Sequence, residues 1–448
     1  MSRLAVRACA LIAAAATSLQ AQAQPLVLTH AMLIDASAPA PRAGWTLVID
    51  GERIRDLFPD GKKAIPAAAR IVDLAGRYVI PGLIDAHVHV ATDPTGRDAN
   101  AADQLRGALL GGVTSVRDMA GDAVVLRDLA RAASAPGAPS PAIYYSAVMA
   151  GPTFFDDPRT RSAAHGGIPG AIPWLKAVSD TTNIAAAVAA AKAAGASGLK
   201  LYADLPANLV AALATEGHRQ GLKVWSHATV YPARPGDLVS AGVDAFSHAV
   251  LLYWQGAAEV PARYHVRASR AVYDSVPISG DVVTTLLRDM QHRGIVLDAT
   301  LFISSRLETA PAGAAGMADP KRAVQWMYDV TRRANELGVA VAAGTDGMMP
   351  GSTTELPNIH REMELLVTRA GFTPLQAIAA ATLNSARAIG IERDAGTIAS
   401  GKVADLVVLR SNPLDDIRNT RDVQLVVKRG AIHGSAAELA RVAERQPR

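Results

Sequence analysis

The middle of the chain alternates between short apolar runs and longer segments with a helical pattern. One helix is predicted at 184–194, which is almost all alanine and has Asn183 as its N-cap. This alternation predicts a (β/α)8 barrel of the TIM type within the α/β class, although it is also compatible with an open doubly wound sheet. The eight predicted barrel strands are 79–89, 114–118, 142–146, 198–202, 223–227, 245–248, 295–301 and 339–346.

Both ends of the chain have a different pattern, with short β-prone runs separated by turns such as Asp50-Gly51. The early runs are 26–29, 32–34, 45–49 and 70–73, and the late runs are 396–398, 404–409 and 423–428. We therefore expect one small composite β-sandwich made from both termini. The predicted domains are a β-sandwich first part at 24–78, the barrel at 79–394, a β-sandwich second part at 395–435 and a tail at 436–448.

The N-terminus has the pattern of a secretory signal peptide. Arg3 and Arg7 precede a short apolar stretch, and Ala21-Gln22-Ala23 offers a small-x-small cleavage site. The apolar stretch is too short to span a membrane. We expect residues 1–23 to be removed near Ala23. The only cysteine, Cys9, lies in this segment, and an exported mature chain without thiols is compatible with a bacterial periplasm.

Composition restricts the classes of partner. Half of the 448 residues are hydrophobic and only 4% are aromatic, so a large core of Ala, Val, Leu and Ile is expected. The net charge of +4 falls to +2 once Arg3 and Arg7 are removed. No basic stripe with interleaved aromatic residues indicates nucleic-acid binding, and no later segment has the pattern of a membrane span. The expected partner is a small molecule, with homo-oligomer formation left open.

Side chains that bind metals occur at the ends of the predicted strands. His87 and His89 are two residues apart on a strand, so both project to the same face. This pair alone is equally compatible with two ordinary hydrogen-bonded histidines. Four more such residues close other strands, and the C-terminal ends of barrel strands form the face where active sites are built. The predicted metal-site residues are His87, His89, Lys200, His227, His248 and Asp346.

Several motifs resemble the metal-dependent amidohydrolase superfamily. Residues 81–89 resemble its strand-one signature and Gly344-Thr345-Asp346 its strand-eight signature, and residues 111–118 and 379–406 are also similar. The resemblance covers nearly the whole mature chain. It is strongest to the branch that holds imidazolonepropionase-related proteins and binuclear Xaa-Pro and Xaa-Arg dipeptidases. It implies a (β/α)8 barrel with a small composite β-sandwich.

The resemblance also implies roles for these residues. His87, His89 and Asp346 would hold one divalent ion, and His227 and His248 a second. Lys200 would bridge both ions as a CO2-derived carbamate, because a free ammonium has no lone pair for a metal; an unmodified lysine that contacts a substrate is the alternative. Zinc is the expected metal for mixed histidine and carboxylate ligands.

The resemblance further implies a mechanism, in which a metal-bridging hydroxide attacks the scissile carbonyl. Asp346 then acts as the catalytic proton shuttle to the leaving nitrogen.

Candidates for substrate binding lie in the loops beyond the strands. His165 resembles a substrate-contacting histidine of the family, and Tyr202, Tyr231 and His360 are further candidates. Arginines in the mouth loops are candidates for binding a substrate carboxylate, because the guanidinium fork matches a carboxylate; they are Arg159, Arg161 and Arg234. We expect Arg117 and Asp118 to form a buried structural pair.

These expectations favour an exported, binuclear metal-dependent hydrolase of amide bonds in dipeptides or N-acyl amino acids. Deaminases of this superfamily usually carry a Glu two residues after the strand-five histidine, whereas His227-Ala228-Thr229 has none. Two alternatives remain at this point. One is a mononuclear hydrolase of a cyclic amide or lactone, and the other is a non-catalytic periplasmic binding protein on the same barrel.

Overall fold

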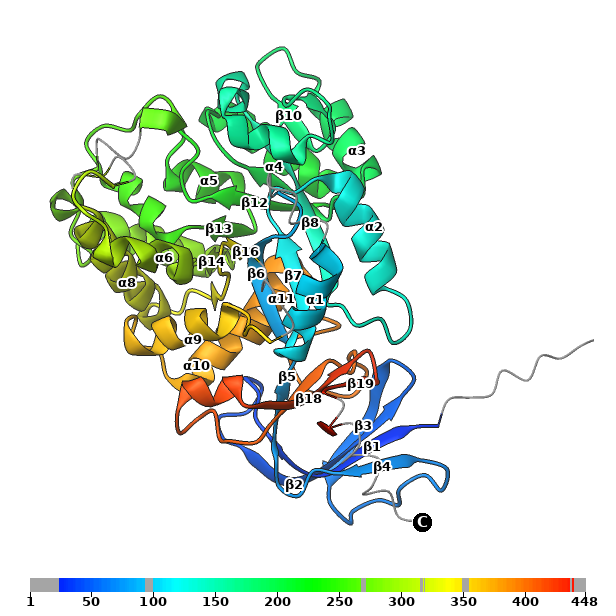
Figure 1. Cartoon of the computed structure of the whole chain (residues 1–448). Helices are drawn as coiled ribbons and strands as arrows, with labels where there is room; N and C mark the ends of the chain where they lie inside the picture. Colours follow the sequence, from blue (N-terminus) through cyan, green and yellow to red (C-terminus); the bar gives the residue numbers. More distant parts are fainter. Residues whose placement is uncertain are drawn as a thin grey trace, which may run out of the picture.

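The structure is a computed structural model that describes residues 24–92, 100–266, 271–314, 317, 319–348, 354–435 and 437–438. Figure 1 shows a barrel with its helices next to a smaller sheet domain. The expected signal peptide and nearly all of the expected C-terminal tail lie outside the described residues. Among the residues described, no helix combines the length and the apolar character needed to cross a membrane.

Eight parallel strand positions form the barrel wall. The eighth position consists of two short strands on either side of Gly344-Thr345-Asp346: the first pairs with strand seven and the second with strand one, and this closes the ring. The predicted (β/α)8 barrel is therefore confirmed over the open sheet. Its strands are β6 (Leu83–His89), β7 (Val113–Asp118), β8 (Ala142–Ala150), β11 (Gly198–Leu201), β12 (Lys223–His227), β13 (Ala245–Ser247), β14 (Val296–Asp298), β15 (Val341–Ala342) and β16 (Gly347–Met348).

Helices cover the outside of the barrel (Figure 1). The predicted N-cap is confirmed, because the Asn183 side chain accepts a hydrogen bond from the amide of Ala186 at 3.0 Å. A π-helical turn at Ala380–Asn384 interrupts the last helical segment and lets the carbonyl of Ala380 accept the amide of Ala343 in strand eight. The helices are α1 (Ala101–Leu110), α2 (Ala123–Ala133), α3 (Ile184–Ala193), α4 (Ala207–Arg219), α5 (Pro235–Ala241), α6 (Asp281–Arg293), α7 (Leu301–Ser305), α8 (Pro320–Glu336), α9 (Ile359–Thr368), α10 (Pro374–Ala379) and α11 (Ser385–Ile389).

The smaller domain is one sheet whose strands come from both ends of the chain. Strand β17 from the C-terminal part pairs antiparallel with β5 from the N-terminal part, which confirms the predicted composite domain. The predicted strand at 396–398 is wrong: the amide of Ile398 donates to the buried carboxylate of Asp35 instead. The strands are β1 (Leu26–Leu33), β2 (Arg42–Asp50), β3 (Arg53–Pro59), β4 (Arg70–Asp73), β5 (Tyr78–Pro81), β17 (Leu406–Leu409), β18 (Val423–Lys428) and β19 (Ala431–His433).

The apolar stretch that leads to the two histidines belongs to both domains. The prediction of one continuous strand over 79–89 is wrong, because the strand breaks at Gly82 into β5 and β6. A Cβ atom at this glycine would lie 2.1 Å from the Thr114 hydroxyl, so no larger residue fits there without displacing β7. A single residue therefore connects the strand of the sheet domain to the barrel strand that carries the two histidines.

Three long connections follow barrel strands and carry short elements of their own. After β8 come two 3-10 helices, Pro152–Asp156 and Pro158–Ala163, and the small strands β9 (Ala171–Ile172) and β10 (Leu175–Ala177). After β13 come the 3-10 helices Ala249–Gln255, Tyr264–Val266 and Tyr273–Ser275. After β14 come α7 and the 3-10 helix Arg306–Thr309. Since they all begin at the C-terminal ends of strands, these segments surround the mouth of the barrel.

The predicted pair of Arg117 and Asp118 is wrong, although both side chains are buried. Consecutive residues on a strand project to opposite faces, so the two cannot meet. Arg117 donates from Nη2 to Asp298 at 3.0 Å. Asp118 accepts the amides of Val90 and Gly121, at 2.6 Å each, and so fastens the turns after β6 and β7.

His360 lies at the opposite end of the barrel from the mouth, which corrects its assignment to the substrate pocket. It is buried in α9, and its Nε2 donates to the carbonyl of Gly111, just before β7, at 2.9 Å. Its Nδ1 lies 3.0 Å from the hydroxyl of Thr420 in the C-terminal part of the chain. The residue therefore links the N-terminal end of the barrel strands, opposite the mouth, to the segment that leads into β18.

This buried histidine predicts a pH dependence of stability. Burial lowers the pKa of His360 to about 4, below its ordinary value of 6.5. The unfolded chain therefore binds a proton between these values that the folded chain does not, and stability is lost as the pH falls from about 6.5 towards 4. We expect this group to contribute a loss of about 2 kcal/mol between pH 7 and pH 5.

His360→Gln removes the titrating group and should flatten the decrease of Tm over this range in a thermal-unfolding series. Since the residue is remote from the mouth, the variant should retain its activity per folded molecule. Parallel pH profiles of wild type and variant would contradict the assignment.

Candidate active site

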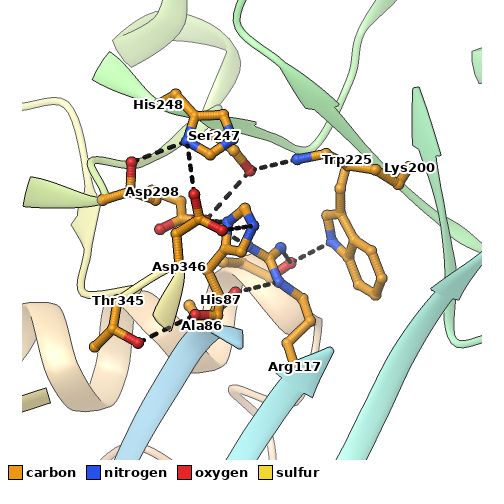
Figure 2. Close-up of polar contacts among 12 residues, drawn as sticks. Ala86, His87, Arg117, Lys200, Trp225, Ser247, His248, Asp298, Thr345 and Asp346 are labelled. Carbon is orange, nitrogen blue, oxygen red and sulfur yellow. Dashed lines mark hydrogen bonds and ion pairs between the residues drawn. The ribbon is translucent and has the colours of Figure 1, made fainter. Parts of the chain in front are cut away.

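The structure brings all six predicted metal-site residues to one end of the barrel. His87 and His89 end β6, His227 ends β12, and His248 directly follows β13. Asp346 lies between β15 and β16, and Lys200 lies within β11. The imidazole ring centroids of His87 and His227 lie 5.1 Å and 4.6 Å from that of His248, so the three histidines form a continuous group. Figure 2 shows His87, His248 and Asp346 converging from three strands.

His87, His89 and Asp346 form the part of the site best suited to a metal. One ligand atom of each lies within 4.8 Å of the others. Asp346 Oδ1 lies 2.8 Å from His89 Nε2 and 3.4 Å from His87 Nε2. Burial opposes ionisation of Asp346, but the surrounding histidines outweigh it and lower the pKa of this carboxyl below its ordinary value. Two imidazole nitrogens and an ionised carboxylate are a donor set that suits a divalent cation.

His227 and His248 form a second group next to this trio. Their rings pack edge to face. His248 Nδ1 lies 3.0 Å from the hydroxyl of Thr300 and 3.8 Å from Asp346 Oδ2. Burial lowers the pKa of His248 to about 3, so the ring is neutral and has a lone pair for a metal. The pair offers imidazole ligands to a second cation but no carboxylate beyond Asp346.

Lys200 is fully buried behind these histidines. Its amine donates to the hydroxyl of Ser247 at 2.8 Å (Figure 2). Burial lowers the pKa of Lys200 to about 7, against the opposing effect of Asp298. A substantial share of the amine is therefore neutral near pH 7, and a neutral amine is the form that can react as a nucleophile.

Asp298, at the end of β14, organises the site, and the sequence analysis missed it. A single oxygen, Oδ2, accepts His87 Nδ1 at 2.8 Å, Arg117 Nη2 at 3.0 Å and the Ser247 hydroxyl at 3.3 Å (Figure 2). The bond to Nδ1 fixes the tautomer of His87 and leaves Nε2 facing Asp346. The signal in the sequence is a lone carboxylate inside the apolar run 295–301, where burial without a partner would be costly.

The strand-eight motif fits tightly around this carboxylate. A Cβ atom at Gly344 would lie 2.1 Å from Asp298 Oδ1 and 2.7 Å from the Cβ of His87, so only glycine fits. Thr345 donates its amide (3.0 Å) and its hydroxyl (2.8 Å) to the two oxygens of buried Asp85. Asp85 also accepts the amide of His87 at 3.2 Å. Residues of β6 and strand eight thus hold each other in register.

A cavity of about 520 Å³ opens above these residues. His87, His89, His227, His248 and Asp346 form its polar floor. Its walls are mostly apolar and come from the long connections. The wall residues include Met119, Phe154, Leu175, Tyr202, Val250, Leu251, Trp254, Tyr264, Tyr273, Ile303 and Met317, with Asp157 and Arg159 as a charged pair.

Of the predicted substrate residues, Tyr202 lines the cavity, with its ring centroid 4.0 Å from that of His227. Tyr231 is buried behind the wall, edge to face with Trp254 at 5.7 Å. The His165 side chain is half exposed and pairs with Asp122 at 2.8 Å, outside the described lining. Tyr231 is therefore not part of the described lining, which corrects its assignment, whereas the substrate contact of His165 stays a prediction.

Of the three mouth-loop arginines, only Arg159 is among the described lining residues. Arg234 instead donates to main-chain carbonyls, including those of Trp254 and Ala257, and so holds the loop after β13. Arg159 is fixed by Asp157, which accepts Nε at 3.0 Å and Nη2 at 2.5 Å. These two bonds orient its guanidinium at the cavity wall.

The position of Asp298 predicts its effect on metal binding. Asp298→Asn keeps the shape but removes the charge that orients His87, and loss of such a supporting group typically lowers metal affinity by about 10- to 100-fold. We expect the variant to lose metal at correspondingly lower chelator concentrations in a competition titration. Asp128→Asn on exposed α2 is the control. An unchanged chelator midpoint in folded Asp298→Asn would contradict the role.

Comparison with known proteins places the chain in a family. Ochratoxinase of Aspergillus niger is 42% identical over 82 residues, a segment that covers 18% of this chain and only 16% of that protein. Imidazolonepropionase of Streptomyces griseus is 26% identical over 401 residues, covering 81% of this chain and 85% of that protein. A putative prolidase from Bifidobacterium longum is structurally similar, with a TM-score of 0.69, 26% identity and coverage of 94% and 98%. The sequence pattern of the Amidohydrolase family matches residues 78–433, which confirms the resemblance: the chain belongs to the Amidohydrolase family.

Proposed function

We propose that this protein is an exported, binuclear metal-dependent hydrolase of amide bonds that acts on N-acyl amino acids or dipeptides. The observation that carries the proposal is the meeting of His87, His89 and Asp346 with a second histidine pair on the floor of an apolar cavity. Four imidazoles and a carboxylate at one barrel mouth are a donor set suited to metal-dependent hydrolysis. This favours an enzyme over a non-catalytic binding protein. Export rests on the pattern of residues 1–23 alone.

The donor set also indicates which residues would hold the metals. His87, His89 and Asp346 would hold the first ion, His227 and His248 the second, and Lys200 as a carbamate would link them. The fixed tautomer of His87 supports this, because Asp298 occupies Nδ1 and leaves Nε2 for a metal. Bound divalent ions would supply Lewis acidity towards a carbonyl and would lower the pKa of water. Zinc remains the expected metal.

The protein's own groups would manage the proton and the substrate. Asp346 is in its ionised form, which is the form that can accept a proton from water at the site. It can then deliver that proton to the leaving nitrogen, which makes an amine a better leaving group. The mostly apolar wall would reduce the contact of a bound substrate with water, and the histidines and Asp346 would form the polar floor towards the scissile bond.

Charges on the described lining favour N-acyl amino acids within this class. Arg159 offers a cation to a substrate carboxylate, and its guanidinium is already oriented by Asp157. The bonds to Asp157 use Nε and Nη2 of Arg159, so a substrate carboxylate would bind at Nη1. Both Asp157 oxygens already accept from Arg159, and Asp346 is the other acid on the described lining. A dipeptide with a free ammonium would lack a dedicated partner there. The similarity to a putative prolidase supports a substrate that resembles a peptide.

A substrate panel tests the proposal. Metal-loaded protein is expected to hydrolyse N-acyl amino acids, and more slowly dipeptides, in preference to lactams and lactones. Asp346→Asn should lower kcat by at least about 100-fold, because general acid–base catalysis contributes that much or more. Hydrolysis of lactones alone, or an unaffected kcat in Asp346→Asn, would contradict the proposed reaction.

The role of Lys200 has its own test. If its carbamate links two ions, wild type should bind about two metals per chain and Lys200→Ala fewer, with most activity lost. Short carboxylates added to Lys200→Ala should restore part of the activity. Lys192→Ala, on the exposed side of α3, is the matched control. One metal per chain in the active wild type would instead favour a mononuclear hydrolase.

A further inference from the structure

We propose that Asp204 fixes an aromatic wall beside His227, and that this wall selects substrates with a planar apolar group next to the scissile bond. The inference rests on the proposed amide hydrolysis and names the substrate class and a positioning residue for it. The wall consists of Phe154, Tyr202 and Tyr264, and all three line the cavity.

The three rings form one contiguous surface next to the second histidine pair. The Tyr202 ring centroid lies 4.4 Å from that of Phe154 and 5.6 Å from that of Tyr264. The Tyr264 ring is stacked at 25° to the imidazole of His227, with centroids 5.9 Å apart. These distances are within the range in which aromatic rings attract each other. A substrate group next to a scissile carbonyl bound beside His227 can therefore lie against this surface.

The rings come from three connections that are far apart in sequence, and Asp204 links them. Its Oδ1 accepts the amide of Tyr264 at 2.8 Å. Its Oδ2 accepts the hydroxyl of Thr153, the neighbour of Phe154, at 2.6 Å. Tyr202 lies two residues before it in the turn after β11. One carboxylate thus ties together the loops after β8, β11 and β13.

The backbone around Asp204 is shaped for this link. Asp204 has a left-handed φ of 54°, which is uncommon for a residue other than glycine. A Cβ atom at Gly151 would lie 2.1 Å from the Asp204 carbonyl oxygen, so the β8 loop can approach only because residue 151 is glycine. The amide of Gly151 donates to the carbonyl of Ala203 at 2.9 Å. The close approach and the strained turn together indicate a constrained link.

We expect the wall to distinguish a planar group by the geometry of ring-to-ring contacts more than by the apolar area that is buried. A phenyl ring and a cyclohexyl ring cover similar apolar area, but only the phenyl ring gains edge-to-face and offset-stacked contacts. Such contacts favour the planar ring by roughly 2- to 10-fold per pair. If the loops separated, the apolar area would remain while the ring geometry would be lost. Asp204 is therefore a positioning residue, and its removal should change selectivity more than chemistry.

The test compares matched amides on metal-loaded full-length protein. The pairs are N-benzoyl-L-alanine with N-cyclohexanecarbonyl-L-alanine, and N-acetyl-L-phenylalanine with N-acetyl-L-cyclohexylalanine, so both sides of the scissile bond are sampled. Wild type should prefer the planar member of at least one pair by roughly 5-fold or more in kcat/KM. Asp204→Ala should bring that ratio close to one, mainly through KM. Thr153→Val removes one of the two links and should give an intermediate ratio.

Asp128→Ala on α2 is the control and should keep the wild-type ratio. A wild-type ratio near one for both pairs, or an unchanged ratio in folded Asp204→Ala or Thr153→Val, would overturn the inference. If wild type hydrolyses none of the four amides, the proposed function fails instead. Calorimetric binding of benzoate and cyclohexanecarboxylate then tests the wall without turnover. Tighter benzoate binding that depends on Asp204 supports the inference, and equal binding overturns it.

Discussion

The site depends on the buried carboxylate of Asp298. Its Oδ2 accepts donors from β6, β7 and β13, so one atom joins three strands that are not all neighbours in the barrel. Burying a carboxylate is costly, and the charge of Arg117 and three hydrogen bonds offset that cost. The pKa of Asp298 is lowered despite its burial, because His87 and Arg117 stabilise the charge. Removal of Arg117 would leave the buried carboxylate without its guanidinium partner, and breaking a buried charge pair in this way is strongly destabilising.

The contact that closes the barrel between strand eight and β6 also positions a carboxylate of the site. Strand eight breaks at Gly344-Thr345-Asp346, and the amide of Asp346 donates to the carbonyl of His87 at 2.8 Å. That bond places the carboxylate opposite the two histidines of β6 as it joins the last strand to the first. Asp85 completes the junction through Thr345. The glycine permits the close contact with Asp298, so the motif is needed for packing as well as for the placement of the Asp346 carboxylate.

Much of this arrangement could be predicted from sequence, because its signals are local. Strand periodicity and polar residues at strand ends predicted the barrel and the six residues that the structure brings together at its mouth. Asp298 was missed because its meaning depends on donors 181 and 211 residues away. His360 was assigned to the wrong end of the barrel because the sequence after the eighth strand does not show that this residue lies in α9 and faces away from the mouth. The break at Gly82 was hidden, since an apolar run looks the same whether it serves one domain or two.

The backbone at the barrel mouth explains why side-chain positions could not be read from strand ends alone. Asp204, Tyr231, His248, Thr300 and Asp346 follow successive strands and all have left-handed φ angles, between 42° and 70°. None is glycine, so each conformation carries a conformational cost that the surrounding packing must hold in place. The amide of His248 is held by the carbonyl of Asp298, and that of Asp346 by His87. In these turns the side chains no longer alternate between two faces as they do along a regular strand. The barrel thus supplies the rigidity that fixes ligands in directions a regular strand cannot present.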